Sequence, residues 1–239
     1  DLQQMIDFHV RKRADVTISA LPVPLKNASS LGVIQVQEKQ RVTGFKEKPK
    51  RPKPIPGRSD EAFASMGNYL FNKDVLIELL YEDAADVGSS HDFGKDILPR
   101  IFNKSRVFAY DFRRNHIPGL TKKEIGYWRD VGTIKAFWEA NMDLRSVKPE
   151  FNLYNKKWPV RTASYGTPPA KFVFNEDGRR GQAIDSIIAE GSIISGGIVQ
   201  DSVIGREVSI DSGAAVINSL LMDRVKIGKN CKINMAIID

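Results

Sequence analysis

The sequence predicts an α/β domain with a mixed sheet, followed by a parallel β-helix. Up to about residue 144, helical patterns alternate with β-rich runs, as expected when helices pack against a sheet. Over residues 187–238, aliphatic residues recur in steps of about six, which is typical of the coils of a β-helix. Residues 145–170 hold four prolines and little periodicity, so we expect a linker there. The predicted domains are therefore 1–144 and 171–239, joined by 145–170.

The chain begins with a predicted helix over Asp1–Arg13. One face of this helix carries Leu2, Met5, Ile6 and Val10. A β-rich run, Val16–Leu21, follows and is ended by Pro22 and Pro24. A helix that leads into a buried strand is typical of a crossover unit in a parallel sheet.

The next segment predicts a hairpin and then a cationic loop. Val33–Val36 and Val42–Phe45 form its strands, with the turn at 38–40. Residues 46–60 are rich in proline and lysine, and most of these cations are expected to form a solvated surface. Lys48 is singled out because it lies between Glu47 and Pro49 where the strand ends. A lysine there can hold a phosphate, and the glutamate can accept hydrogen bonds from hydroxyl groups.

Ala64–Phe71 predicts another strand, in which Gly67 either permits close approach of a ligand or only packs against a neighbouring backbone. An amphipathic helix through Leu80 follows. Ser89–Asp96 opens a further helix, which extends to Ile101. Asp92 falls near its N-terminus, where the helix dipole favours a carboxylate even without a function.

Arg106–Phe112 predicts a strand, and a polar loop spans residues 113–126. Tyr127–Asp130 then reads as a strand end before the turn at Gly132, with a helix that begins at Thr133. An acidic residue at such a strand end lies where α/β sheets bind ligands, although Asp130 could also cap the helix.

The β-helix prediction rests on aliphatic residues that recur about every six positions, with a slip before Ile227. These are Ile187, Ile193, Ile198, Ile204, Ile210, Val216, Met222, Ile227 and Ile233. Gly205 and Gly228 directly follow aliphatic positions, which suits the corners of coils.

Composition excludes several classes of protein. The net charge is +7, but the basic residues are dispersed and no aromatic-interleaved basic motif occurs, so we expect no nucleic-acid partner. No apolar run is long enough for a membrane span, and we expect no membrane partner. A single cysteine, Cys231, rules out an internal disulfide framework and fits a reducing compartment, so a cytoplasmic location is expected.

Five blocks, in order, resemble the bacterial glucose-1-phosphate adenylyltransferase (ADP-glucose pyrophosphorylase) family. They are Phe45–Pro49, Ala64–Tyr69, Ser89–Asp96, Tyr127–Thr133, and the pair Trp158–Thr162 with Pro168–Phe172. The resemblance implies a nucleotidyltransferase-like (Rossmann-like) domain and a left-handed β-helix in an allosteric homotetramer. It also implies a reaction of glycogen biosynthesis in which ATP and glucose 1-phosphate give ADP-glucose and pyrophosphate, with magnesium as cofactor.

The resemblance also implies the roles of individual residues. Lys48 is similar to the lysine that binds the sugar phosphate, and Asp130 to one of two aspartates that hold magnesium; these two are the catalytic candidates. The expected sugar pocket surrounds Lys48 and consists of Glu47, Ser65, Gly67, Tyr69, Asp92, Phe93 and Trp128.

The sequence lacks the family's glycine-rich nucleotide loop, its second metal aspartate and its last β-helix turns. We therefore expect a fragment that is inactive by itself. The main alternative is a non-catalytic regulatory subunit of the same family, against which the retained Glu47, Lys48, Asp92 and Asp130 argue. A pyrophosphorylase for another sugar phosphate also remains open. A hexapeptide-repeat acyltransferase is disfavoured because all three histidines precede the repeats.

Overall fold

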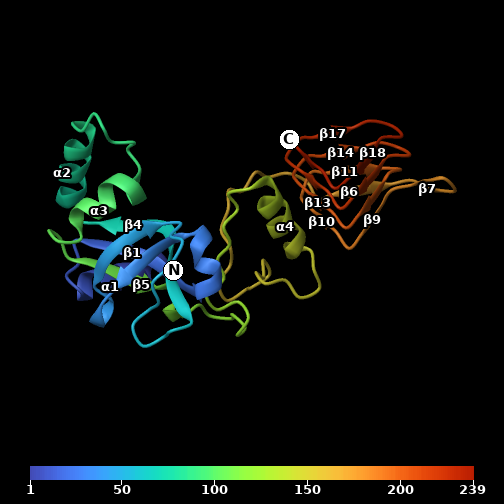
Figure 1. Ribbon diagram of the computed structural model, residues 1–239. Helices are drawn as coiled ribbons and strands as arrows, with labels where there is room; N and C mark the ends of the chain where they lie inside the picture. The colour runs from blue at the N-terminus through green and yellow to red at the C-terminus, as the bar shows by residue number, and fades with distance from the viewer. The chain divides into compact units, whose positions relative to one another are not determined.

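The computed structural model describes residues 1–239 as two units, Asp1–Ile117 and Pro118–Asp239. The first unit is built on a five-stranded sheet in the order β3-β2-β4-β1-β5 (Figure 1). Its elements are α1 (Leu2–Arg11), β1 (Val16–Pro24), β2 (Gly32–Val36), β3 (Val42–Glu47), β4 (Glu61–Phe71), α2 (Lys73–Ala84), a π-helical turn (Phe93–Ile97), α3 (Leu98–Ile101) and β5 (Val107–Asp111), with short 3₁₀ turns at Leu25–Ser30, Glu38–Gln40 and Phe112–Arg114.

The mixed sheet is confirmed. Strand β1 lies between β4, which is antiparallel to it, and β5, which is parallel. The predicted hairpin is also present, since β2 and β3 pair in antiparallel fashion. Strand β1 continues through Pro22 to Pro24, so the prediction that the prolines end it was wrong; Pro22 pairs with Phe63 on β4.

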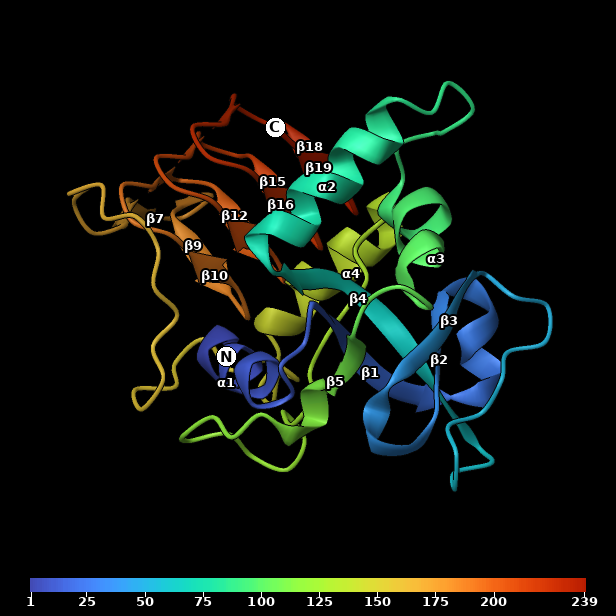
Figure 2. The ribbon, with the colours of Figure 1, turned by 90° about the vertical axis from the view of Figure 1, so that its left-hand side faces the viewer.

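Alternate residues of β1 face two separate layers. Ile18 belongs to the main core, which α2 and α3 complete from one face of the sheet. Thr17 faces α1, where its hydroxyl lies 2.8 Å from Nδ1 of His9. The first five residues of β1 are therefore buried, and Figure 2 shows helices on both faces of the sheet. This double burial agrees with the composition of the strand, in which the only polar side chains are the small hydroxyl groups of Thr17 and Ser19.

The second unit contains α4 (Ile134–Leu144) and a parallel β-helix with three faces. The strands of the three faces are β10-β13-β16-β19, β17-β14-β11-β6 and β18-β15-β12-β9. Their bounds are β6 (Lys171–Val173), β9 (Gln182–Ile184), β10 (Ile187–Ile188), β11 (Ile193–Ser195), β12 (Ile198–Gln200), β13 (Val203–Ile204), β14 (Ser209–Ile210), β15 (Ala215–Ile217), β16 (Leu220–Leu221), β17 (Lys226–Ile227), β18 (Lys232–Asn234) and β19 (Ile237–Ile238), and β7 (Asn175–Glu176) with β8 (Arg179–Arg180) forms a protruding hairpin.

The predicted β-helix is confirmed, but the six-residue spacing does not always mark the residue that points inward. Of that series, Ile204, Ile210, Val216 and Ile227 point inward. Ile193 and Ile198, in contrast, are 44% and 39% exposed, and their neighbours Ile194 and Val199 fill the core instead. Similarly, Leu221 and not Met222 belongs to this core.

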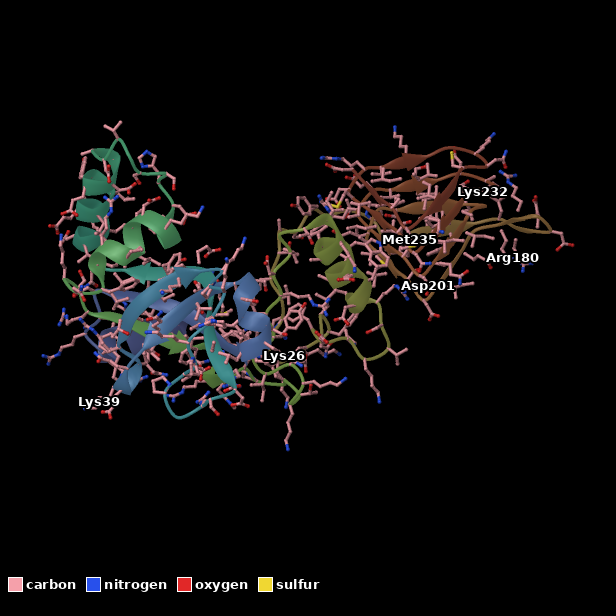
Figure 3. The ribbon with its side chains drawn as sticks, in the orientation of Figure 1. Lys26, Lys39, Arg180, Asp201, Lys232 and Met235 are labelled. Atoms are coloured by element: carbon pink, nitrogen blue, oxygen red, sulfur yellow. The ribbon has the colours of Figure 1, made fainter.

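The corners of the coils are built from residues in the left-handed backbone region. One corner column consists of Asp185, Asp201, Asn218 and Met235, each with φ between 44° and 50°. Figure 3 labels Asp201 and Met235 from this column. A ladder of buried serines runs beside it, because the backbone N–H of Ser219 donates to the hydroxyl of Ser202 at 3.1 Å. The serine hydroxyl groups of this ladder accept hydrogen bonds from backbone N–H groups at the corner, where regular strand pairing stops.

Helix α4 packs against the β-helix within the second unit. Its Trp138 donates its indole N–H to the Asn218 carbonyl at 2.9 Å. Just beyond the helix, Arg145 pairs with Asp201 at 2.8 Å. Residues 145–170 contain no helix or strand. The domain boundaries at 144 and 170 stay a prediction.

Candidate functional site

Five of the residues expected in the sugar pocket lie together in the first unit. We call this group the Tyr69 cluster, and it consists of Glu47, Ser65, Tyr69, Asp92 and Phe93. Tyr69 is its centre: burial raises the pKa of its phenol, the Ser65 hydroxyl opposes this in part, and the carboxylates of Asp92 and Glu47 raise the pKa further. The phenol therefore stays protonated at neutral pH and can donate a hydrogen bond.

A β-bulge in β4 sets the direction of Ser65 and Tyr69. Ser65 pairs with Ala20 and Tyr69 with Ile18, so three residues of β4 lie opposite Ser19 alone. Gly67 lies at the middle of this bulge with φ of 74°, which L side chains rarely adopt. A Cβ at Gly67 would meet no atom within 4 Å, so the glycine serves the backbone conformation and leaves open space beside the strand. Bulges of this kind commonly redirect side chains next to binding sites.

Asp92 enters the cluster from the loop Ser89–Asp96, which we call the 89–96 loop. Its carboxylate caps the following turn, because Oδ1 accepts from the N–H groups of Gly94 at 2.8 Å and Lys95 at 2.9 Å. Both bonds go to Oδ1, and Oδ2 is left to accept a bond from a ligand. The expectation that Asp92 begins a helix is confirmed, although the first turn is π-helical and α3 follows it.

Phe45 connects the two sides of the cluster and was missed in the sequence. Its ring packs so closely that a Cβ at Gly94 would lie 3.0 Å from it, and one at Gly32 would lie 2.5 Å from it. Gly32 pairs with Glu47 across the hairpin. The two glycines therefore let Phe45 hold the end of β3 against the 89–96 loop. The signal in the sequence was that Phe45 opens the block Phe45–Pro49 of the family resemblance, two residues before Glu47.

Lys48 follows β3 and has an unusual backbone. Its φ is 41°, although it is not glycine and precedes Pro49, which disfavours helical conformations. Such a residue costs about 1–3 kcal/mol and needs support from its surroundings. Its N–H donates to the Leu31 carbonyl at 3.1 Å, which fixes the backbone in this position. Strain of this kind is often found at ligand-binding positions.

Trp128 and Asp130 belong to the second unit. The prediction that Tyr127–Asp130 ends a strand was wrong, since residues 127–132 form no helix or strand. Their aromatic residues favour a strand, but no sheet edge pairs with them; instead Tyr127 stacks on Phe151 at 5.3 Å. Thr133 caps α4 as expected, and its side chain accepts from the N–H of Ala136.

Asp130 is exposed and lines a groove of about 610 Å³ along α4. Its Oδ1 accepts from the N–H of Gly132 at 2.9 Å, while Oδ2 is free. No group of three or more His, Cys, Asp or Glu residues in the chain could hold a metal ion. The free oxygen of Asp130 could supply one ligand to a metal ion whose other ligands come from substrate phosphates and water.

None of the helices combines the length and hydrophobicity that a membrane span requires.

Comparison with known proteins agrees with both parts of the fold. The profile described as "Nucleotidyl transferase" matches residues 1–147, and "GlmU-like, C-terminal hexapeptide" matches residues 168–239. A glucose-1-phosphate adenylyltransferase of Anaeromyxobacter sp. (strain Fw109-5) is 49% identical over 242 residues, which cover 100% of this chain and 59% of the relative. The enzyme of that name from Thermus thermophilus is 52% identical over 90% of this chain and 52% of its own length.

A third relative, the glucose-1-phosphate adenylyltransferase of Geobacter metallireducens, is 50% identical over 100% of this chain and 58% of its own length. The chain thus spans somewhat more than half the length of the curated relatives that it matches. The profile match covers well over half of the chain, and the mixed sheet with its following β-helix agrees with it. The chain belongs to the nucleotidyl transferase family.

Proposed function

We propose that this chain is the sugar-phosphate-binding part of a glucose-1-phosphate adenylyltransferase. The observation that carries the proposal is the Tyr69 cluster, in which a phenol, a hydroxyl and two carboxylates converge. Lys48 directly follows Glu47 of this cluster in the chain. Neutral and acidic oxygens of this kind suit the hydroxyl groups of a hexose, and a lysine suits its phosphate. The relatives that carry this name match the chain at about half of all positions, which supports the same assignment.

In the proposed reaction, an oxygen of glucose 1-phosphate attacks the α-phosphorus of ATP in line, and pyrophosphate leaves. No protein nucleophile is needed, so catalysis depends on position and on charge. Lys48 would hold the sugar phosphate, while Asp92 Oδ2, Glu47 and the Tyr69 phenol would orient the sugar. The product ADP-glucose would supply glycogen biosynthesis.

Nucleotidyl transferases generally use a divalent metal ion, and we propose magnesium here. Asp130 fits this ion, because a free carboxylate oxygen is a ligand that Mg²⁺ prefers. Bound magnesium would offset the negative charge that develops on the phosphates. We further propose that the whole protein is an allosteric homotetramer in the cytoplasm.

Calorimetry on the 239-residue chain tests the proposal. Wild type should bind glucose 1-phosphate, and more tightly than glucose 6-phosphate or galactose 1-phosphate. Lys48→Ala should weaken binding by about 10- to 100-fold, since a hydrogen bond to a charged group contributes about 1.5–3 kcal/mol. Lys50→Ala is the matched control, because Lys50 is an exposed cation of the same loop, and it should bind as wild type does.

Two outcomes would contradict the proposal. One is a wild-type chain that binds no hexose 1-phosphate, and the other is equal binding by wild type and Lys48→Ala. In the whole protein, the same substitution should raise the KM for glucose 1-phosphate far more than the KM for ATP. Formation of ADP-glucose by the whole protein would separate the enzyme from a non-catalytic regulatory subunit.

A further inference from the structure

A buried carboxylate outside the Tyr69 cluster connects α2 with the 89–96 loop. Asp83 lies in the last turn of α2 and is only 3% exposed. Its Oδ1 accepts from the Ser89 hydroxyl at 2.6 Å, and its Oδ2 lies 2.7 Å from Nδ1 of His91. Arg100 approaches the same carboxylate at 3.7 Å. Carboxylates are rarely buried unless such donors surround them.

Each of these partners has a direct effect on the loop. The Ser89 hydroxyl, besides donating to Asp83, accepts from the backbone N–H of His91 at 3.0 Å. His91 has φ of 58°, a left-handed conformation that a non-glycine residue keeps only when other contacts hold it. Asp83 supplies those contacts through both Ser89 and the imidazole, and His91 is the residue directly before Asp92.

A second anchor lies on the other side of Asp92. The carboxylate of Asp96 accepts from the Ser90 hydroxyl at 2.6 Å and from the Asp92 N–H at 3.1 Å. This second anchor is internal to the loop, so it shapes the loop without attaching it to anything else. Among side chains, Asp83 therefore provides the attachment of the loop's first half to a helix of the main core.

Charge within this network supports the assignment. The hydrogen bonds from Ser89 and then from His91 lower the pKa of Asp83, and the positive charge of Arg100 acts in the same direction. Arg100 is itself held by Asp86 at 2.6 Å. Asp83 therefore remains an anion that accepts from several donors at neutral pH, as a fixed anchor requires.

We propose that Asp83 is a positioning residue that fixes the 89–96 loop so that Asp92 and Phe93 stay in the Tyr69 cluster. This inference rests on the function proposed above, since the cluster is the site for the sugar phosphate. Asp83 need not touch the sugar; it acts through Ser89 and His91.

Hydrogen exchange of the 239-residue chain, followed by mass spectrometry, tests whether Asp83 fixes the loop. In Asp83→Ala the amides of residues 89–96 should exchange about tenfold faster or more, because charge-assisted hydrogen bonds are lost, while β1 and β5 should exchange as in wild type. Asp86→Asn is the matched control: Asp86 follows α2 and contacts Arg100, but not the side chains of Ser89 or His91. Its Oδ1 accepts from the Gly88 N–H at 2.9 Å, a bond that asparagine can keep. The loop of this variant should exchange at the wild-type rate.

Calorimetry with glucose 1-phosphate then tests whether the fixed loop matters for binding. Asp83→Ala should bind about tenfold more weakly, and Asp83→Asn, which keeps the shape and one acceptor oxygen, should recover part of the affinity. If Asp83→Ala fails to fold, Asp83→Asn and Ser89→Ala give the same two readouts, and both should show intermediate effects.

Unchanged exchange over residues 89–96 in these variants would overturn the inference, as would faster exchange with unchanged affinity. A wild-type chain that does not bind glucose 1-phosphate would overturn the proposed function. The exchange measurement needs no ligand, so it would still decide whether Asp83 fixes the loop.

Discussion

The ring of Phe93 stacks on the ring of Tyr69, with centroids 5.7 Å apart and planes at 18°. Tyr69 belongs to β4, and Phe93 directly follows Asp92 in the 89–96 loop. The stack therefore joins the loop to the sheet at the point where the polar groups of the cluster converge. The face of the Tyr69 ring packs against Phe93, so the hydroxyl group is the part of Tyr69 that can contact a ligand.

This arrangement predicts different effects for the ring and for the hydroxyl of Tyr69. Tyr69→Phe keeps the stack but removes the donor, so the dissociation constant of glucose 1-phosphate should rise about three- to tenfold, as expected for one neutral hydrogen bond. Thermal unfolding should not change. Tyr81→Phe is a suitable control because Tyr81 is 76% exposed on α2. If Tyr69→Phe binds the sugar phosphate as wild type does, the phenol has no role in binding.

The ion pair between Asp15 and Arg106 predicts a pH-dependent contribution to stability. The guanidinium of Arg106 donates to Asp15 Oδ1 at 2.7 Å and to Oδ2 at 3.2 Å, and its backbone N–H donates to Oδ2 at 2.7 Å. The hydrogen bonds from the Arg106 side chain are the main cause of a lowered pKa of Asp15. The carboxylate therefore stabilises the fold above its unfolded-state pKa of about 4, and this contribution disappears as the pH falls through that value to the lower folded-state pKa.

Asp15→Asn should accordingly lower the free energy of unfolding by about 1–2 kcal/mol at pH 7, and the difference from wild type should shrink as the pH falls below the unfolded-state pKa of about 4. Urea denaturation across this pH range measures it. Asp177→Asn, at the exposed β7–β8 hairpin, is the control and should show little difference at any pH. If the difference in the free energy of unfolding between wild type and Asp15→Asn grows as the pH falls, the pKa of Asp15 is not lowered in the folded state.

The register of the β-helix predicts opposite outcomes for two adjacent isoleucines. Ile194 is fully buried in the core of the coils, whereas Ile193 is 44% exposed on the outer surface. Ile194→Ala should lower the free energy of unfolding of the β-helix by about 2–4 kcal/mol, because it leaves a cavity. Ile193→Ala should cost less than about 1 kcal/mol. Val199→Ala and Ile198→Ala provide a second pair with the same expected order, and a reversed order in denaturant unfolding would show that the register is wrong.

The same pair shows why the sequence predicted the β-helix but not its full register. Successive side chains of a strand point alternately into and out of the coil. Because residues 193–194 and 198–199 are adjacent pairs of aliphatic residues, either member of each pair could be the inward one, and spacing alone cannot select it. Pairing between coils selects it: Ile194 pairs with Phe172 on one side and with Ile210 on the other. A full turn takes 16 or 17 residues, as the pairs Ile194–Ile210 and Ile210–Ile227 show, so a strict step of six drifts out of register.

Local signals predicted the hairpin and the helix start at Asp92 in the first unit, and the cap at Thr133 in the second, because each depends on a few neighbouring residues. The strand at Tyr127–Asp130 failed because β-propensity does not supply a partner strand. The convergence of Glu47, Ser65, Tyr69 and Asp92 depends on contacts between distant segments, and only the resemblance to a family suggested it. Their roles in binding stay a prediction.

Met235 occupies the last position of the left-handed corner column. Asp185, Asp201 and Asn218 occupy the corresponding positions of earlier coils, and Asn and Asp adopt this backbone region more readily than other non-glycine residues. Met235 has φ of 50° and is 69% exposed, so its side chain offers little packing in return for the strain. Met235→Gly and Met235→Asn should therefore raise the free energy of unfolding of the β-helix by about 0.5–1 kcal/mol.

Asn234→Gly is the matched control for this prediction. Asn234 precedes Met235 in β18 and has no left-handed backbone, so glycine there should destabilise the β-helix by about 0.5–1 kcal/mol, mainly through the entropy of the unfolded chain. Glycine should thus raise the free energy of unfolding at position 235 and lower it at position 234, which distinguishes relief of backbone strain from a general effect of glycine. Destabilisation by both Met235→Gly and Met235→Asn in urea unfolding would mean that the side chain contributes more at this corner than its exposure indicates.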